Sequence, residues 1–257
     1  MNASGIDLFS LANKTVLVTG GTRGIGQAIS LRFARAGATV IANYVRDEKA
    51  ASHVKSIAAE EGLNILLSRG DLTNEKGLEQ LNGLLQEQVP TISGLVHCAA
   101  TGVHRPLEEL TDRHFDWTFN LNVRAFFKLV KLLMPRFSRG SCIVAISSWG
   151  ALRALPSYSL VGSSKGALEA LARHLAAELA PRGIRVNILT AGAILTDAWK
   201  AMPNGDARIA ETIRRTPAGR LASADEIAYG AQFLCSDASS AVIGQTLVLD
   251  NGIGIVA

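Results

Sequence analysis

The chain has 257 residues, of which 48% are hydrophobic, and its net charge at pH 7 is +4. This apolar content supports a large core, but no stretch reaches the roughly 20 apolar residues that a membrane span needs. Dispersed basic residues and an aromatic content of 5% argue against a nucleic-acid groove, so the basic surface is either simply solvated or a docking site for an acidic partner.

The expected compartment is the cytoplasm. Residues 1–13 lack the basic start and the apolar core of a secretory signal. The three cysteines, Cys98, Cys142 and Cys235, are widely spaced in apolar surroundings, which argues against a disulfide framework and for a reducing compartment. No Cys/His cluster in the sequence has the spacing of a zinc site, so we predict no metal centre.

Short aliphatic runs recur along the chain and are separated by helical stretches. The runs are continuous rather than alternating, which is typical of strands buried on both faces. They span residues 15–19, 39–43, 65–68, 94–98, 142–147, 185–189 and 246–249. Without any linker between them, they predict one α/β domain over residues 1–257, a Rossmann-type doubly wound parallel sheet of about seven strands with helices on both faces. Ligands of such sheets bind at the carboxyl ends of the strands.

The first predicted strand runs into a glycine-rich turn that opens a predicted helix at residues 26–36. Gly20, Gly24 and Gly26 lack Cβ atoms, so the backbone can approach a pyrophosphate that is held at the helix N-terminus. The alternative is a purely structural glycine turn, but the strand–turn–helix context favours a dinucleotide. The residues predicted to contact it here are Gly20, Thr22, Arg23, Gly24, Ile25 and Gly26.

The end of the second predicted strand bears on which dinucleotide binds. It reads Asn43-Tyr44-Val45-Arg46 and has no carboxylate to bond a ribose 2′-hydroxyl. Arg23 and Arg46 can instead flank a 2′-phosphate, which favours NADPH over NADH; the alternative is that Arg46 is a solvated surface residue. Asp71 is either a contact of the adenine edge or the N-cap of the next helix. We also predict cofactor contacts from Asn43 and Leu72.

Further motifs follow in chain order, and together they resemble the short-chain dehydrogenase/reductase family from Lys14 to Gly252. They are Asn122, Ser147-Ser148, Lys165, Asn187, Ala191-Gly192 and Thr196. The resemblance implies catalytic roles for Asn122, Ser148 and Lys165, and a homotetramer. It also implies cofactor contacts from Ala99, Ala100, Lys165, Gly192, Ile194 and Thr196. One departure is His97-Cys98, where the family usually has two asparagines; His97 is either a base or a hydrogen-bonded structural group.

A second departure concerns the catalytic tyrosine. The family carries it four residues before the lysine, where this chain has Val161. The nearest tyrosine is Tyr158, seven residues before Lys165, which is close to two helical turns, so both side chains share one helix face. The phenol is thereby moved about one turn, or ~4.5 Å, along the helix axis. The alternative is that Tyr158 is an ordinary surface anchor near a helix start.

The displaced tyrosine suits conjugate reduction. Hydride then goes to Cβ of a 2-enoyl thioester, and charge develops on the thioester oxygen, further from the nicotinamide than a ketone oxygen would be. The Tyr-x6-Lys spacing, with segments 158–171, 192–198 and 216–220, is similar to NADPH-dependent enoyl-acyl-carrier-protein reductases of type III. That resemblance implies that Tyr158 stabilises the enolate oxygen, and that Lys165 holds the ribose and lowers the tyrosine pKa. Asn122 is expected in a network behind Lys165, and the role of Ser148 stays open.

Residues 198–216 are predicted to form a lid over the substrate. Trp199, Met202, Ile209 and Ile213 line an acyl channel or simply pack. A carrier protein would be met by Lys200, Arg208, Arg214 and Arg215.

Three functions remain open at this point. The first is hydride transfer from NADPH to an enoyl thioester, as in fatty-acid or polyketide synthesis. The second is a short-chain carbonyl or 3-ketoacyl reductase, and the third is an NADPH-binding protein without catalysis, which Val161 favours.

Overall fold

The computed structural model describes residues 7–89, 91–194 and 205–256. It is built on a parallel sheet of seven strands in the order β3-β2-β1-β4-β5-β6-β7. The strands are β1 (Thr15–Thr19), β2 (Thr39–Tyr44), β3 (Ile65–Arg69), β4 (Gly94–His97), β5 (Cys142–Ser148), β6 (Arg185–Ala191) and β7 (Thr246–Leu249). The predicted fold is confirmed. β6 runs two residues beyond its predicted end because Thr190 and Ala191 still pair with Ser147 and Ser148 of β5.

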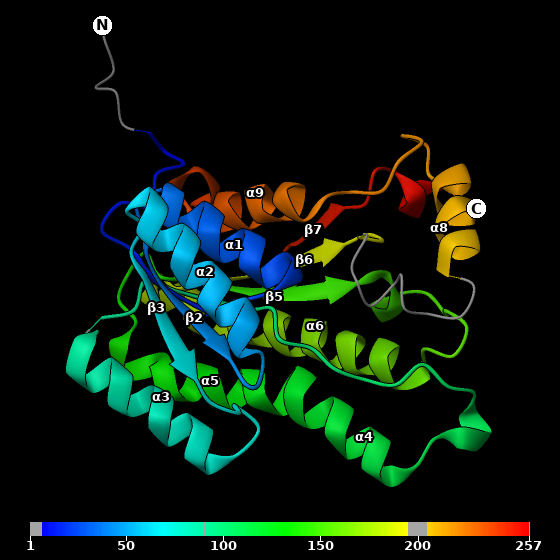
Figure 1. Ribbon diagram of the computed structural model, residues 1–257, viewed down its shortest axis with the longest axis horizontal. Coiled ribbons are helices and arrows are strands. Elements are labelled where there is room, and N and C mark those ends of the chain that lie inside the picture. Colours follow the sequence, from blue (N-terminus) through cyan, green and yellow to red (C-terminus); the bar gives the residue numbers. More distant parts are fainter. Residues whose placement is uncertain (1–6, 90, 195–204, 257) are drawn as a thin grey trace, which may run out of the picture.

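Helices cover both faces of this sheet (Figure 1). The helices are α1 (Gly24–Arg35), α2 (Glu48–Glu61), α3 (Glu75–Gln88), α4 (Asp112–Phe119), α5 (Ala125–Leu133), α6 (Ser159–Leu179), α8 (Gly205–Arg215) and α9 (Ala224–Cys235). One face carries α1, α2 and α9, and the other carries α3, α4, α5 and α6. α8 lies at the end of the molecule toward which β5, β6 and β7 point.

The core consists of two layers, because successive strand residues face opposite sides of the sheet. Along β1, Val16 and Val18 join the cluster beneath α1 and α9, whereas Leu17 joins the cluster beneath α3, α5 and α6. Phe33 of α1 and Phe126 of α5 are fully buried in the first and second layer respectively. Burying one such side chain contributes roughly 1.5–3 kcal/mol, so the continuous aliphatic strands anchor both layers of helices.

Most described helices on these faces start at a capping side chain. Asp47 caps α2, Asn74 caps α3, and Ser223 forms a reciprocal capping box with Glu226 at α9. The alternative reading of Asp71 as the cap of α3 is therefore wrong, because Asn74 accepts the Gly77 amide at 2.9 Å. α1 differs: its N-cap position, Arg23, provides no capping hydrogen bond, and its first turn has no acidic residue. The amides at this helix start are thus left for another acceptor.

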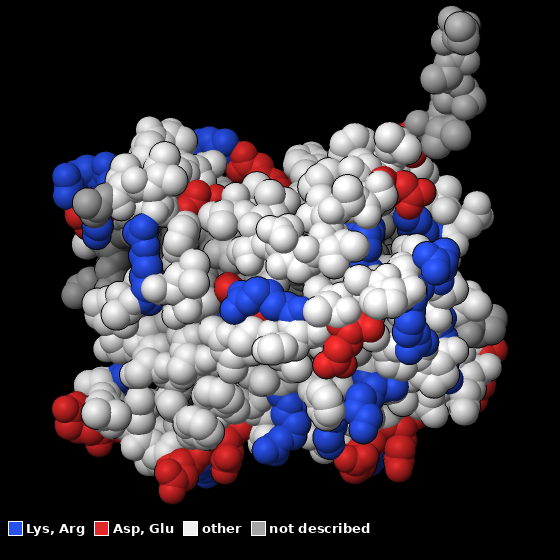
Figure 2. Space-filling view, turned by 180° about the vertical axis from the view of Figure 1, so that it is seen from behind, with Lys and Arg blue, Asp and Glu red and all other residues white. Residues whose placement is uncertain are grey.

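The strand order reverses between β1 and β4, which are neighbours in the sheet. Their carboxyl ends, together with the start of α1, mark the place where a doubly wound sheet binds its ligand. Within the described part of the chain, no helix is long and apolar enough to cross a membrane. Basic and acidic side chains lie interspersed on the face of the molecule seen in Figure 2, and the described basic residues in view do not join into one band.

Candidate active site

The turn between β1 and α1 has the shape of a phosphate cradle. Gly20 and Gly24 have φ values of +63° and +52°, which side chains with a Cβ rarely adopt. A Cβ at Gly26 would lie 2.1 Å from the Gly20 carbonyl oxygen, so only glycine allows the helix to start this close to the turn. Thr22 is buried, whereas Arg23 is exposed. The positive backbone torsions and the uncapped helix start fit a pyrophosphate.

The end of β4 is locked onto this cradle. The Thr19 hydroxyl accepts the Cys98 amide at 3.1 Å and the Ala99 amide at 3.0 Å. A Cβ at Gly20 would lie 3.2 Å from the Ala99 Cα, so the two loops are in close contact. Two predicted cofactor segments, which are about 80 positions apart in sequence, are thereby brought to one place.

The ends of β2 and β3 form the side where the adenosine half of a dinucleotide is predicted. Asn43 is buried, its amide donates to the Ser68 and Gly70 carbonyls, and its own carbonyl accepts the Gly21 amide at 2.9 Å. Its side chain therefore holds the strand ends together. Asp71 accepts the Thr73 amide and hydroxyl. The Leu72 side chain is buried in the core.

The two predicted phosphate-binding arginines are exposed. Within the described residues neither Arg23 nor Arg46 forms an ion pair. Arg69 at the end of β3 is also exposed, but it pairs with Glu48 at 2.9 Å. Among the described residues, these two cations thus have no carboxylate partner, and they belong to the loops after β1 and β2.

The phenol of Tyr158 reaches the end of β5. Tyr158 is half-buried at the start of α6, and its hydroxyl lies 3.3 Å from the Ser148 hydroxyl. The surface-anchor alternative does not describe this arrangement. Val161, at the position where the family has its tyrosine, is buried and packs beside Gly102: a Cβ on Gly102 would lie 2.2 Å from Val161 Cγ2. The space for the usual tyrosine is thus filled, and the hydroxyl arrives from one turn earlier.

Lys165 lies on the buried face of α6. Its ammonium donates to the Ile146 carbonyl at 2.7 Å and is 5% exposed. Burial lowers the pKa of Lys165 to about 8, and the negative charge of Glu169, one turn along α6, acts in the opposite direction. The lysine therefore stays mainly protonated at pH 7.

Asn122 lies in a π-helical turn, Asn120–Arg124, between α4 and α5. Its side chain accepts the Thr101 amide and donates to the Thr101 carbonyl, both at 2.9 Å. It also donates to the Ser164 hydroxyl, next to Lys165, at 2.9 Å. Wide turns of this kind often occur at functional sites. The arrangement connects the loop after β4 to α6.

His97 is a structural group in this arrangement. It is fully buried, and its Nδ1 lies 3.2 Å from the Thr19 hydroxyl. Burial, with a further contribution from the charge on Lys165, lowers the pKa of His97 to about 3. A side chain that is inaccessible and neutral at pH 7 in this way favours the structural interpretation over that of a catalytic base.

The sequence analysis missed several residues that touch the site. His104 packs edge-on against Tyr158, with ring centroids 5.1 Å apart. Glu169 is 3% exposed and accepts the Ser147 hydroxyl at 2.6 Å, which braces the end of β5. Gly150 and Gly162 border the tyrosine ring. The only signal for Glu169 in the sequence is its spacing of four residues from Lys165, which puts both side chains on one helix face.

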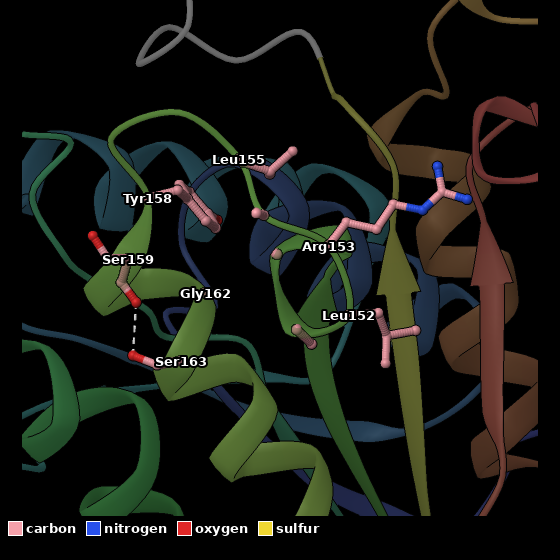
Figure 3. A pocket seen from close by; sticks show the side chains of 10 residues that line it. Leu152, Arg153, Leu155, Tyr158, Ser159, Gly162 and Ser163 are labelled. Atoms are coloured by element: carbon pink, nitrogen blue, oxygen red, sulfur yellow. Dashed lines mark hydrogen bonds between the residues drawn. The ribbon is translucent and has the colours of Figure 1, made fainter. Parts of the chain in front are cut away.

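A cavity of about 360 Å³ opens beside the Tyr158 ring, between the loop after β5 and the first turns of α6 (Figure 3). Leu152, Arg153 and Leu155 form its loop side, and Ser159 and Ser163, which are hydrogen-bonded to each other, line its helix side. The tyrosine is thus reachable from outside, as a group that acts on a substrate must be.

The last predicted segments lie beyond β6. The Gly192 amide donates to the Leu249 carbonyl, and Ile194 bridges to Ala222. Thr196, Trp199, Lys200 and Met202 lie outside the described residues. Within the predicted lid, α8 directs Ile209 and Ile213 into an apolar groove of about 380 Å³ that Ile194 and Leu221 also line.

The basic residues predicted to meet a carrier protein differ in their surroundings. Arg214 pairs with Glu211 at 2.7 Å, whereas Arg215 is exposed.

Comparison with known proteins identifies the family. Residues 20–254 match the family model described as enoyl-(acyl carrier protein) reductase. The chain is 32% identical to 1-cyclohexenylcarbonyl-CoA reductase of Streptomyces collinus, covering 94% of this chain and 87% of that protein. It is 34% identical to 7alpha-hydroxysteroid dehydrogenase of Escherichia coli K12, covering 96% of each. A gluconate 5-dehydrogenase of Burkholderia cenocepacia, solved with NADP and tartrate, superposes with a TM-score of 0.88 at 28% identity, covering 98% of this chain and 99% of that one. The chain therefore belongs to the enoyl-(acyl carrier protein) reductase group of the short-chain dehydrogenase/reductase family, and is an oxidoreductase built to bind a nicotinamide cofactor.

Proposed function

We propose that the protein reduces the carbon–carbon double bond of a 2-enoyl thioester with NADPH. The observation that carries the proposal is the Tyr158 hydroxyl at 3.3 Å from Ser148, combined with a buried Val161 at the usual tyrosine position. The acid of this site is attached one helical turn earlier than in an ordinary carbonyl reductase. A conjugated acceptor needs this displacement, because its oxygen lies three bonds beyond the carbon that receives hydride.

The cofactor would supply a hydride to the β-carbon of the enoyl group, and the residues of the chain provide the remaining chemistry. The Tyr158 hydroxyl would donate a hydrogen bond to the thioester oxygen as negative charge develops there. The resulting enolate would take a proton at its α-carbon, supplied by the phenol or by water, which completes the reduction of the double bond. The Ser148 hydroxyl, within reach of the same phenol, orients it. The buried ammonium of Lys165, which donates to the Ile146 carbonyl, would hold the ribose of the cofactor.

NADPH is proposed as the cofactor on the basis of charge. Arg23 and Arg46 border the cradle with no carboxylate partner within the described residues, and no acidic residue ends β2. Guanidinium groups suit a phosphate monoester, which they can bind through paired hydrogen bonds.

Carbonyl reduction is the second candidate. Ser148 and Tyr158 bring two hydroxyl groups close together, which also suits the oxygen of a ketone. The name of the hydroxysteroid dehydrogenase relative points the same way. The two candidates differ in which carbon accepts hydride, so a substrate comparison separates them.

The test compares crotonyl and acetoacetyl thioesters as substrates with NADPH, in the wild type and in Tyr158→Phe. We expect turnover of the crotonyl thioester, and a fall in kcat of about 100-fold or more in Tyr158→Phe, the usual effect of removing one donor to a developing oxyanion. The Kd for NADPH, measured by fluorescence titration, should stay within about twofold, because the phenol acts on the substrate.

Two results would contradict the proposal. Faster reduction of the acetoacetyl than of the crotonyl thioester would establish the carbonyl reductase instead. Tight NADPH binding with no turnover of either thioester would leave a cofactor-binding protein.

A further inference from the structure

The ring of Tyr158 lies in a gap that two glycines create. Gly150 belongs to the short turn Trp149–Ala151 that follows β5, and Gly162 lies in the first turns of α6. A Cβ at Gly150 would lie 2.3 Å from Tyr158 Cε1 and 2.5 Å from its Cδ1. A Cβ at Gly162 would lie 2.7 Å from the Gly150 carbonyl oxygen and 3.4 Å from Tyr158 Cδ1. Real Cβ atoms essentially never come within 3.0 Å of a neighbour, so the contacts with the Tyr158 ring at Gly150 and with the Gly150 carbonyl oxygen at Gly162 would force a shift, whereas the 3.4 Å contact is ordinary.

Neither glycine is needed for its backbone conformation, because neither has a positive φ. Glycine is therefore required at these two positions because a larger side chain would not fit. On another side, His104 packs against the same ring at 63°, so the phenol has little room to swing away from the glycines. Figure 3 shows the Tyr158 ring near Gly162, where the loop after β5 passes the start of α6.

The loop is also held in place, so it cannot easily retreat from a larger side chain. Trp149 donates its indole N–H to Asp250 at 2.8 Å. Arg153 stacks on Trp149 at 4.8 Å and donates to the Gly254 carbonyl. Trp149 and Arg153 thus tie the loop around Gly150 to the C-terminal segment, so neither the loop nor the tyrosine ring can give way easily.

We propose that Gly150 and Gly162, here called the phenol slot, are the positioning residues that allow a tyrosine one turn earlier to serve this site. A tyrosine at position 161 would project from the buried face of α6. The side chain of Tyr158 must instead pass the loop after β5 to reach Ser148. The slot gives it that path. The catalytic part of this inference rests on the proposed function, and the steric part does not.

The test replaces Gly150 with alanine and uses Gly166→Ala as the matched control. Gly166 lies on α6 one turn beyond Gly162, and a Cβ there would be 3.5 Å from the Ala151 carbonyl oxygen, an ordinary contact. Relieving the clash at Gly150 needs a shift of about 1 Å, and a misplacement of that size can cost about 100-fold in rate. We expect kcat for the crotonyl thioester to fall about 100-fold in Gly150→Ala with unchanged NADPH affinity, and to stay near wild type in Gly166→Ala.

A second measurement needs no substrate. The melting temperature is compared for Gly150→Ala alone and in a Tyr158→Ala background, where the ring is gone. We expect Gly150→Ala to lower the melting temperature of the wild type but not that of Tyr158→Ala. Equal lowering in both backgrounds, or a Gly150→Ala variant that matches Gly166→Ala in kcat and stability, would overturn the slot.

The two measurements also separate the two proposals. If the wild type does not reduce enoyl thioesters while the stability cycle behaves as expected, the proposed function fails and the steric slot stands. If the wild type reduces enoyl thioesters but Gly150→Ala lowers the melting temperature equally with and without Tyr158, the phenol slot is wrong and the proposed function stands.

Discussion

Lys165 combines burial with charge, and this combination is costly to stability. The ammonium is 5% exposed and has one described hydrogen-bond acceptor, the Ile146 carbonyl, at 2.7 Å. Burial lowers its pKa from an ordinary value of 10.5 to about 8. The unfolded chain therefore binds the proton more tightly than the folded protein does, and folding pays a penalty at neutral pH. Active sites commonly contain perturbed groups of this kind.

The penalty predicts a pH dependence of stability. Below pH 8 both states are protonated and the penalty is fully present; between pH 8 and 10.5 the folded protein loses the proton first, so stability rises. Relative to Lys165→Met, which has nothing to titrate, the wild type should gain about 2 kcal/mol in free energy of unfolding between pH 7.5 and 9.5. Urea unfolding of both proteins at these two pH values measures the gain. The prediction is contradicted if the free energy of unfolding differs between the two proteins by the same amount at both pH values.

Among the elements, α1 is distinguished by its start. Several other helices have an N-cap side chain that accepts a hydrogen bond from a first-turn amide. In contrast, α1 begins at Gly24 without a capping hydrogen bond and without an acidic residue in its first turn. The cost of this uncapped start is of order 1 kcal/mol. A bound phosphate would accept hydrogen bonds from these free amides. The start of α1 therefore suits a ligand and lowers the stability of the ligand-free protein.

The close approach of α1 to the glycine turn gives a second prediction. In Gly26→Ala the new Cβ would meet the Gly20 carbonyl oxygen at 2.1 Å, so the turn must open. We expect the Kd for NADPH to rise at least about tenfold, or roughly 1.4 kcal/mol, measured by isothermal titration.

Gly83→Ala is the matched control. This glycine lies in the middle of α3, and its Cβ would meet nothing within 4 Å. The substitution should leave NADPH binding unchanged and raise the free energy of unfolding by about 0.5–1 kcal/mol. Equal loss of NADPH binding in both variants would contradict the cradle.

For the whole molecule, the sheet topology builds the cofactor site from separate segments. The order β3-β2-β1-β4 places the glycine turn beside the ends of β2 and β4, as the Gly21–Asn43 and Thr19–Ala99 hydrogen bonds show. Arg23 and Arg46, which belong to different loops, thereby border one edge of the sheet. Cofactor choice is thus a property of the assembled fold.

A third prediction tests that choice. In Arg46→Ala we expect kcat/KM for NADPH to fall about 30-fold, or roughly 2 kcal/mol, because a hydrogen bond to a charged phosphate is lost. The value for NADH, which has no 2′-phosphate, should change little. Arg69→Ala is the control, because Arg69 is also exposed but pairs with Glu48. Steady-state kinetics with both cofactors would refute the assignment if Arg46→Ala and Arg69→Ala behaved alike.

By itself the sequence determined the strands, the parallel sheet, the glycine turn and the displaced tyrosine, because these depend on local spacing and on residue type. Continuous aliphatic runs mark strands buried on both faces, and the spacing of Tyr158 and Lys165 follows from the chain itself. The structure places Tyr158 at the N-cap of α6, just outside the helix on which the sequence predicts it. Only the tertiary structure decided that the phenol meets Ser148, that Glu169 braces Ser147 and that Gly150 makes room for a ring. These contacts join a loop, a strand end and a helix, and their distances depend on how the elements pack, which no spacing along the chain encodes.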